Sequence, residues 1–206
     1  MDLLVASTNP HKLDELREIL APGGWHVVSL EEVEGGPFEE PVEDEPTFEG
    51  NARKKALHYA GATGRVCLAD DSGLEVAALD GRPGVHSARY SGVEGDRATR
   101  DKANNDKLLR ELEGVPDDER TARFVCAMCV CDPGGNVICE ARGEVEGRIG
   151  HAPVGAHGFG YDPLLVLTDP DDPFAGKSSA ELEPDDKHQR SHRGKAARRI
   201  AKLLKG

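Results

Sequence analysis

The sequence predicts an α/β fold in which a mixed β-sheet is flanked by helices. Short apolar runs that suit buried strands alternate with helical patterns near the N-terminus, and a long hairpin pattern follows near the middle of the chain. Crossovers and an antiparallel hairpin in one chain require a mixed sheet rather than a purely parallel one. No period of 20–50 residues repeats, which argues against a solenoid. With 206 residues, a single domain over 1–206 is expected.

The first hundred residues contain most of the alternation. Residues 3–6 form an apolar run that predicts a strand, and leucines at offsets of three and seven predict a helix over 11–21. A second strand is expected at 26–30. Residues 31–49 hold nine acids, no base and three prolines, so they predict a loop.

The other elements follow from caps, apolar runs and turn residues. We expect a helix from Thr47 to Gly61, and an apolar run at 66–69 that a turn at 70–73 separates from its continuation at 74–79. The remaining expected elements are a loop over 82–98, a helix over 99–113, a hairpin of strands 121–131 and 137–149, a strand over 164–167 and a helix over 191–204.

Charge is distributed unevenly along the chain. The formal net charge is −12, yet residues 187–206 hold eight basic side chains and no acid, so the rest is strongly acidic. Binding to nucleic acid or to anionic membranes depends on distributed Lys and Arg contacts with phosphate, so neither partner is expected. A small polyanion can still bind locally.

Targeting signals and cysteine usage indicate a cytoplasmic protein. The N-terminus lacks a basic segment followed by a long apolar one, and the longest apolar run, 124–131, is too short to cross a bilayer. Five cysteines suit reduced thiols. Cys126 and Cys129 form a C-x-x-C pattern inside a β run, where they face opposite sides and cannot share one tetrahedral metal. We expect ordinary core cysteines there.

The junction between the first strand and the first helix is the first candidate site. Free backbone N–H groups at a helix N-terminus attract anions, so this junction favours phosphate binding. The alternative is an ordinary helix cap with a solvated lysine, because the Walker pattern is absent. The residues are Ser7, Thr8, Asn9, Pro10, His11 and Lys12.

Two adjacent carboxylates, Asp70 and Asp71, make the second candidate, followed by Ser72 and Gly73. Strand ends position metal-binding acids, and neighbours in a strand point to opposite faces, so only one of the pair should enter a given cleft. Asp and Gly also favour turns without any function, which is the alternative.

Two more candidates lie in the last third of the chain. Aromatic residues that alternate with glycines leave ring faces open to a planar ligand such as a nucleobase, although they also often plug a loop core. These residues are Gly158, Phe159, Gly160, Tyr161 and Asp162. A cationic group near the last helix could meet phosphate or a base oxygen, or remain solvated. Its members are Lys187, Ser191, His192 and Arg193.

Six ordered blocks together resemble the inosine triphosphate pyrophosphatase family, whose bacterial members are dITP/XTP pyrophosphatases. The blocks lie at residues 7–12, 47–56, 69–74, 83–92, 158–163 and 191–193. The resemblance spans nearly the whole chain, from residue 3 to residue 197. It implies a homodimer of elongated α/β subunits, each with two lobes and a cleft between them. It also implies Mg²⁺-dependent hydrolysis of ITP, dITP, XTP and dXTP to the monophosphate and pyrophosphate.

The resemblance also implies roles for individual residues. Asp71 would be the proton acceptor and, with Glu43, a metal ligand. Contacts to the substrate would come from Ser7, Thr8, Asn9, Pro10, His11, Lys12, Lys55, Ser72, Phe159, Gly160, Tyr161, Asp162, Lys187, His192 and Arg193. One position departs from the family pattern: Gly50 stands where a glutamate is usual, which changes the local set of acids.

Base selectivity follows from hydrogen-bond chemistry if Arg193 and His192 face the base. Arg193 can only donate, so it can hydrogen-bond to the 6-keto oxygen of inosine or xanthosine but meets another donor in the 6-amino group of ATP. Guanine keeps the keto group, so its exclusion needs another element at the 2-amino group, for which Asp162 and nearby backbone are candidates. Two alternative functions stay open: a pyrophosphatase for pyrimidine or modified nucleotides, and a non-catalytic nucleotide-binding regulator.

Overall fold

The computed structural model describes residues 2–7 and 9–205. The chain divides into two compact units. Unit 1 comprises Met1–Ser72, Cys126–Gly143 and Ser191–Gly206, and unit 2 comprises Gly73–Val125 and Glu144–Arg190. The cleft between two lobes stays a prediction, as does the assignment of residues 1–206 to one domain.

In the described residues, six strands form one mixed sheet, which confirms the predicted fold class. The strands are β1 (Asp2–Val5), β2 (His26–Ser29), β3 (Cys67–Val76), β4 (Thr121–Cys131), β5 (Val137–Ile149) and β6 (Leu165–Leu167). Their order in the sheet is β2-β1-β3-β4-β5-β6. β1 pairs in parallel with β2 and β3, whereas β6 is antiparallel to β5.

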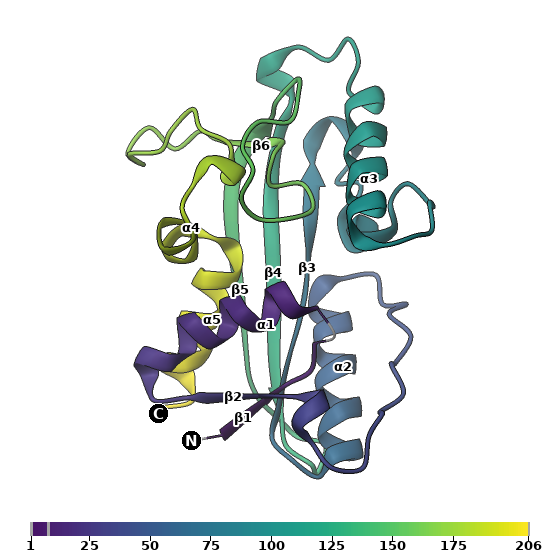
Figure 1. The fold of residues 1–206 in the computed structure, drawn as a ribbon, viewed down its shortest axis with the longest axis vertical. Coiled ribbons are helices and arrows are strands. Elements are labelled where there is room, and N and C mark those ends of the chain that lie inside the picture. Colours follow the sequence, from purple (N-terminus) through teal and green to yellow (C-terminus); the bar gives the residue numbers. More distant parts are fainter. Residues whose placement is uncertain (1, 8, 206) are drawn as a thin grey trace. The chain divides into compact units, whose positions relative to one another are not determined.

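Unit 1 packs two helices together beside its parallel strands. Figure 1 shows α1 (Pro10–Leu20) next to α5 (His192–Leu203), and their apolar faces share one buried cluster with Leu3, Val5 and Leu68. α1 begins where the Asn9 side chain accepts a hydrogen bond from the backbone N–H of His11. α2 (Phe48–Thr63) belongs to the same unit and begins after Thr47, as the sequence predicts. It ends at Gly64 rather than at the expected Gly61.

Unit 2 has its own core under α3 (Arg97–Glu111). Leu108 and Leu112 are fully buried in it, together with Leu74, Ile149 and Leu164. A short helix, α4 (Pro184–Arg190), also lies in this unit and was not expected from the sequence. Its seven residues carry no apolar side chain, so hydrophobic periodicity could not reveal it.

The predicted turn at 70–73 is wrong, because β3 runs without interruption through both acids. Asp70 is paired with Lys12, and Asp71 accepts a hydrogen bond from the Asn51 side chain, so neither carboxylate needs a solvent-exposed turn. Beyond them, the Leu74 N–H donates to the Ser87 hydroxyl. Tertiary partners therefore override the turn preference of Asp and Gly.

A buried arginine supports unit 2. The Arg120 side chain donates from Nε, Nη1 and Nη2 to the backbone oxygens of Ile149, Leu112 and Gly150 at 2.8, 2.8 and 2.9 Å. Only 2% of this residue is exposed. It links the end of α3 to the end of β5, and the Leu112 carbonyl also accepts from the Val115 N–H.

We therefore expect Arg120→Met to destabilise the protein. Each buried carbonyl left without a partner costs about 1–3 kcal/mol, and the Leu112 carbonyl keeps its bond from Val115, so the loss should be about 2 kcal/mol or more. Urea unfolding measures it, with Arg110→Met on the exposed side of α3 as the control. A change below about 1 kcal/mol at Arg120 would show that these bonds contribute little.

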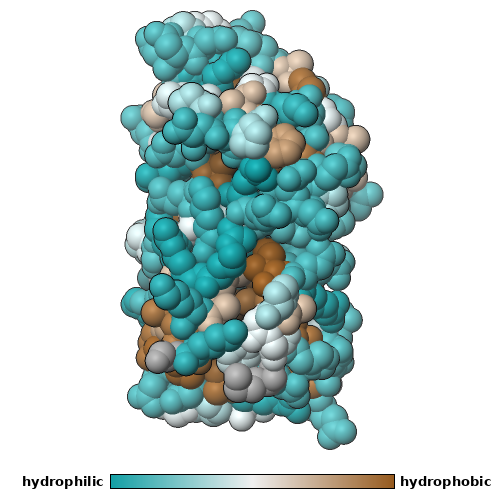
Figure 2. Space-filling view, turned by 90° about the vertical axis from the view of Figure 1, so that its left-hand side faces the viewer, coloured by the Kyte–Doolittle hydropathy of each residue, from teal (hydrophilic) through white to brown (hydrophobic). Residues whose placement is uncertain are grey.

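One face of the molecule is mainly hydrophilic. Figure 2 shows one face, on which hydrophilic residues cover most of the area and hydrophobic ones form separate small patches. Among the described residues, no helix has the length and apolar composition that crossing a membrane requires.

Candidate functional site

Asp70 and Asp71 lie at the centre of a group of charged side chains in unit 1. We call this group the strand-end cluster; its members are Lys12, Glu15, Glu43, Lys55, Asp70, Asp71 and Arg193. Most of them are less than 10% exposed, although Lys12 and Glu43 are half-buried. Charges in so dry an environment interact far more strongly than on the surface.

Asp70 is the structural anion of this cluster. Its Oδ2 atom lies 2.9 Å from Lys12 Nζ and 3.6 Å from Arg193 Nη2. Burial alone would raise the pKa of the Asp70 carboxyl, but the positive charges of Lys12, Arg193 and Lys55 hold it well below its usual range. The Asp70 carboxylate is therefore ionised, and its charge is already paired with Lys12 and Arg193.

Asp71 has a different environment, although it is the next residue. Its two carboxylate oxygens accept hydrogen bonds from Asn51 Nδ2 at 3.0 Å and from the Ser72 N–H at 2.9 Å. Burial raises the pKa of the Asp71 carboxyl, and the neighbouring Glu43 raises it further, against the lysines that lower it. No cation forms an ion pair with Asp71 in the described residues, so this carboxylate is available to a metal ion or a proton.

Lys55 connects the acidic loop to the strand. It projects from α2, is 8% exposed, and its Nζ atom lies 2.5 Å from Glu43 Oε1. Burial would lower the pKa of Lys55, but Asp70, Asp71 and Glu43 together raise it. The loop at 31–49, which carries Glu43, is thus tied to the cluster by an ion pair.

The N-terminal junction of α1 is arranged as the sequence suggests. Ser7 Oγ accepts from the Asn9 N–H at 3.2 Å, and Asn9 Oδ1 accepts from the His11 N–H at 3.1 Å. Pro10 occupies the first helical turn, and Lys12 points to Asp70. Thr8 lies outside the described residues. The junction therefore places the α1 N-terminus in the same unit as both aspartates.

Arg193 lies in the first turn of α5 and is 2% exposed. Its Nη1 atom donates to Glu15 Oε2 at 2.5 Å, and its Nη2 atom donates to Ser72 Oγ at 3.0 Å. His192 beside it is 8% exposed. Sequence reasoning missed Glu15, although its place one helical turn after Lys12 on α1 could have indicated it.

A second group of side chains surrounds the segment 158–163 in unit 2, which we call the base loop. Asp162 Oδ2 accepts from the Phe159 N–H and from Lys187 Nζ, both at 2.8 Å. From α3, Asp101 Oδ2 accepts from the Gly160 N–H at 2.9 Å, and Asn105 Nδ2 donates to the Gly160 carbonyl at 3.0 Å. Asp101 and Asn105 carry no sequence signal that separates them from other polar helix residues.

The two aromatic residues of the base loop have different environments, which corrects the expectation of two open rings. Tyr161 is 5% exposed, packs in the core of unit 2 and donates its hydroxyl to the Ser87 carbonyl at 2.9 Å. Phe159 is only partly buried, and cations of Arg97 and Lys187 lie 4.4 and 5.2 Å from its ring centroid. Phe159 is thus the ring of this loop that a ligand can reach.

The expected site residues therefore fall into two groups. Unit 1 contains Ser7, Asn9, Lys12, Glu43, Lys55, Asp71, Ser72, His192 and Arg193, and unit 2 contains Phe159, Gly160, Tyr161, Asp162 and Lys187. Lys187 is paired with Asp162, whereas Arg193 is paired with Glu15, so the cationic group of the sequence is divided. The departure at Gly50 also has a structural reason, because a Cβ there would collide with the Glu45 side chain.

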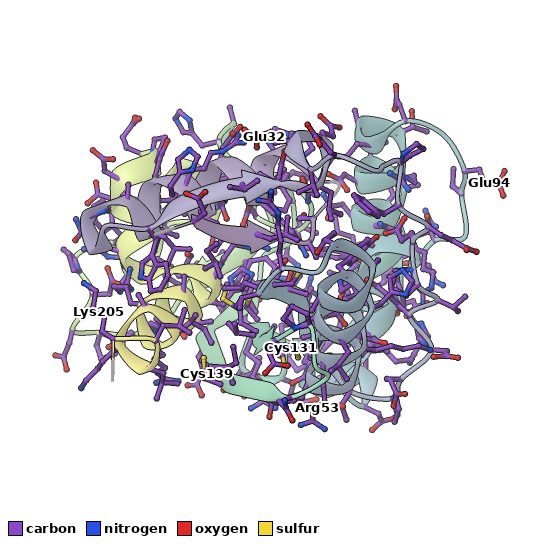
Figure 3. All side chains as sticks on the ribbon, turned by 90° about the horizontal axis from the view of Figure 1, so that it is seen from below. Glu32, Arg53, Glu94, Cys131, Cys139 and Lys205 are labelled. Atoms are coloured by element: carbon purple, nitrogen blue, oxygen red, sulfur yellow. The ribbon has the colours of Figure 1, made fainter. Side chains whose placement is uncertain are left out.

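The cysteines of the C-x-x-C pattern are core residues, as expected. Cys126 and Cys129 both lie on β4 and are fully buried. Cys126 Sγ lies 3.9 Å from Asp70, whereas Cys129 Sγ lies 3.5 Å from Cys131 Sγ. Figure 3 labels Cys131 on β4 and Cys139 on the neighbouring β5. Burial raises the pKa of all of these thiols, which makes them poor nucleophiles.

A mixed α/β fold in which lysines and an arginine surround paired buried carboxylates on a central strand defines a class of α/β enzymes. Within that class, the chain belongs to the Ham1 family, whose model matches residues 3–203. This membership confirms the resemblance found in the sequence.

Relatives and solved structures agree with this membership. A dITP/XTP pyrophosphatase of an Exiguobacterium species is 48% identical over 200 residues, which cover 97% of this chain and 95% of the relative. A dITP/XTP pyrophosphatase of Bacillus subtilis is 45% identical over 203 residues, which cover 98% of this chain and 96% of the relative. The Staphylococcus aureus Ham1 protein superposes with a TM-score of 0.83 at 35% identity, and the match covers 100% of this chain and 99% of that protein. A nucleoside-triphosphatase of Mycobacterium abscessus, also named dITP/XTP pyrophosphatase, superposes with a TM-score of 0.74 at 43% sequence identity. The match covers 99% of each chain.

Proposed function

We propose that this protein hydrolyses non-standard purine nucleoside triphosphates, ITP, dITP, XTP and dXTP, to the monophosphate and pyrophosphate. The relatives that match it over nearly their whole length are named dITP/XTP pyrophosphatases. The observation that carries the proposal is the difference between the two aspartates. Asp70 is neutralised by Lys12 and Arg193, whereas Asp71 is held by neutral donors and keeps its charge available.

Asp71 and Glu43 would hold the Mg²⁺ ion that the family resemblance implies. Both offer hard carboxylate oxygens, which Mg²⁺ prefers, and Glu43 is close enough to raise the pKa of the Asp71 carboxyl. Lys55, which pairs with Glu43 and lowers the pKa of the Asp71 carboxyl, is now the cation that both carboxylates share, and a divalent ion would fit the same pair of anions. When bound, Mg²⁺ would neutralise phosphate charge and lower the pKa of a bound water.

The roles of the protein's own residues follow from their positions. Asp71 orients an attacking water and accepts its proton. Lys12 and Lys55, now paired with Asp70 and Glu43, offset the charge that develops on the leaving pyrophosphate. The α1 N-terminus, with Ser7, Thr8, Asn9, Pro10 and His11, contacts the triphosphate, and Ser72 also contacts the substrate.

The base would be bound by the base loop. Phe159 offers a ring for stacking, and Lys187 and Asp162 fix the loop by their ion pair. Gly160 and Tyr161 contribute backbone contacts, because the Tyr161 side chain is occupied in the core. His192 and Arg193 remain the proposed readers of the 6-keto group. A homodimer and a cytoplasmic location, which the resemblance and the cysteine usage indicate, are part of the same proposal.

A panel of nucleoside triphosphates tests the function. With Mg²⁺ present, pyrophosphate release should be fastest from ITP and XTP, because their 6-keto groups accept from donor-only side chains. Release mainly from UTP or dTTP would favour a pyrimidine-directed pyrophosphatase. Binding without release from any nucleotide would favour a non-catalytic regulator.

The base loop itself gives a direct prediction. Gly158 has φ of +81°, and a Cβ there would collide with the Asp162 and Lys187 side chains. The collision displaces the ion pair of Asp162 and Lys187 that fixes the loop, and the left-handed conformation adds about 1–2 kcal/mol of strain, so Gly158→Ala should raise KM for ITP by about tenfold. Steady-state kinetics measure this, with Gly176→Ala as the control, since its φ is +86° but its Cβ would meet nothing. Equal effects of both substitutions would mean that backbone strain alone matters.

A further inference from the structure

Arg97 is placed beside the base loop in an unusual way. Its guanidinium carbon lies 4.4 Å from the centroid of the Phe159 ring, and its side chain is 34% exposed. In the described part of the chain, its Nε atom is buried without a hydrogen bond, although the Asp101 carboxylate is 3.5 Å away. The guanidinium is thus held by a ring and an ion pair, which leaves its terminal N–H donors for a ligand.

The position of Arg97 also opposes a local rule of helix formation. Arg97 and Arg100 occupy the first turn of α3, which contains no acid. A positive charge at a helix N-terminus is unfavourable by about 0.3–1 kcal/mol, because the helix dipole is positive there. Part of this cost is offset by the ion pair with Asp101 one helical turn later and by the contact with the Phe159 ring. The preceding loop, where Figure 3 shows Glu94 pointing away from α3, is exposed and leaves Arg97 accessible.

Several acceptor atoms around Phe159 already have partners. Asp162 Oδ2 accepts from the loop backbone and from Lys187, Asp101 Oδ2 accepts from Gly160, and the Gly160 carbonyl accepts from Asn105. The Asn105 Oδ1 atom is buried and has no hydrogen-bond partner in the described residues. Two cations, Arg97 and Lys187, lie near the ring, and Arg97 is the nearer to its centroid.

A side chain that can only donate discriminates between purines at position 2. Xanthine carries a carbonyl oxygen there, hypoxanthine carries a hydrogen, and guanine carries an amino group that can only donate. Arg97 has no acceptor to offer such an amino group. We propose that Arg97 is a specificity-determining residue that faces position 2 of the bound base and so favours XTP and disfavours GTP. The inference rests on the proposed function.

The inference supplies the element at the 2-amino group that the sequence left unidentified. Asp162 was a candidate for it, but a carboxylate acceptor would attract the amino group of guanine rather than oppose it. Donor facing donor leaves two N–H groups without partners, which a site built for hydrogen bonds rejects strongly. Xanthine also loses a ring proton near neutral pH and becomes negatively charged. The positive charge of Arg97 would then attract the xanthine base as well.

The test compares XTP, ITP and GTP as substrates of wild-type protein and of Arg97→Gln. Glutamine keeps a long polar side chain but adds an acceptor, so kcat/KM should fall for XTP and rise for GTP. We expect the ratio of kcat/KM for XTP to kcat/KM for GTP to fall by at least tenfold, while kcat/KM for ITP changes less than threefold. The matched control is Arg100→Gln, an exposed arginine on the same helical turn, which should leave all ratios unchanged.

The outcomes separate the inference from the proposed function. Equal losses for all three nucleotides, or an unchanged XTP-to-GTP ratio, would overturn the role of Arg97 while wild-type activity on ITP and XTP still supports the function. A wild-type protein that releases no pyrophosphate from ITP or XTP would instead overturn the proposed function. Ratios measured within one variant do not depend on its folded fraction, so a loss of stability cannot imitate the expected result.

Discussion

Asp71→Asn should nearly abolish turnover of ITP while the nucleotide still binds. The amide cannot accept a proton from water, and general-base catalysis typically contributes about 10²–10⁴-fold. Asparagine keeps the size of the side chain and can keep the hydrogen bond to the Ser72 N–H. We therefore expect kcat to fall by at least a hundredfold, while Kd for ITP, measured by calorimetry, stays within about tenfold.

The neighbouring aspartate provides a comparison within the same strand. Asp70→Asn removes the anion that pairs with the half-buried Lys12 and leaves the buried Arg193 with Glu15 alone, so its main effect should be on stability. An exposed acid, Asp118→Asn, serves as the control for charge. An Asp71→Asn protein with substantial kcat would remove the proposed role of Asp71 as the proton acceptor.

Arg193→Ala should lower kcat/KM for ITP by more than tenfold, which corresponds to at least about 1.4 kcal/mol. If Arg193 hydrogen-bonds to the 6-keto group, the ratio of kcat/KM for ITP to kcat/KM for ATP should also decrease. The structure adds a second effect, because the substitution leaves Glu15 and Asp70 without their buried partner. Breaking a buried ion pair on one side costs about 3–5 kcal/mol of unfolding free energy.

A second variant separates these two effects. Glu15→Gln removes the ion pair with Arg193 but leaves the guanidinium in place, so it should lower stability without narrowing the ITP-to-ATP ratio. If Arg193→Ala lowers kcat/KM for ITP and for ATP by the same factor, Arg193 contacts phosphate or only stabilises the fold. The selectivity argument at position 6 would then be wrong.

Much of the fold could be predicted from the sequence because local signals agreed with tertiary packing. The N-cap at Asn9, the cap at Thr47 and the hairpin turn at 132–136 all lie where caps and turn residues indicated them. The turn at 70–73 was wrong, because the partners that stabilise extended backbone there, Lys12 and Asn51, are distant in sequence.

The same distinction applies to the candidate site. Residues in motifs, such as Lys12 and Asp71, could be named from the sequence because each lies beside a helix start or a strand. The sequence indicates Glu15 only by its place one turn after Lys12, and it does not indicate Arg97 or Asp101. The roles of these three residues depend on contacts with Arg193, Phe159 and Gly160. Such pairings join segments about 60 to 180 positions apart, which periodicity and capping rules do not address.

Phosphorus NMR of the products formed from ITP and Mg²⁺ tests the central claim most directly. A water that Asp71 activates for release of pyrophosphate should give IMP and pyrophosphate in equal amounts, with no IDP at any time. The same spectra with Asp71→Asn should show unchanged ITP. Formation of IDP and inorganic phosphate, or unchanged ITP with the wild-type protein, would contradict the account.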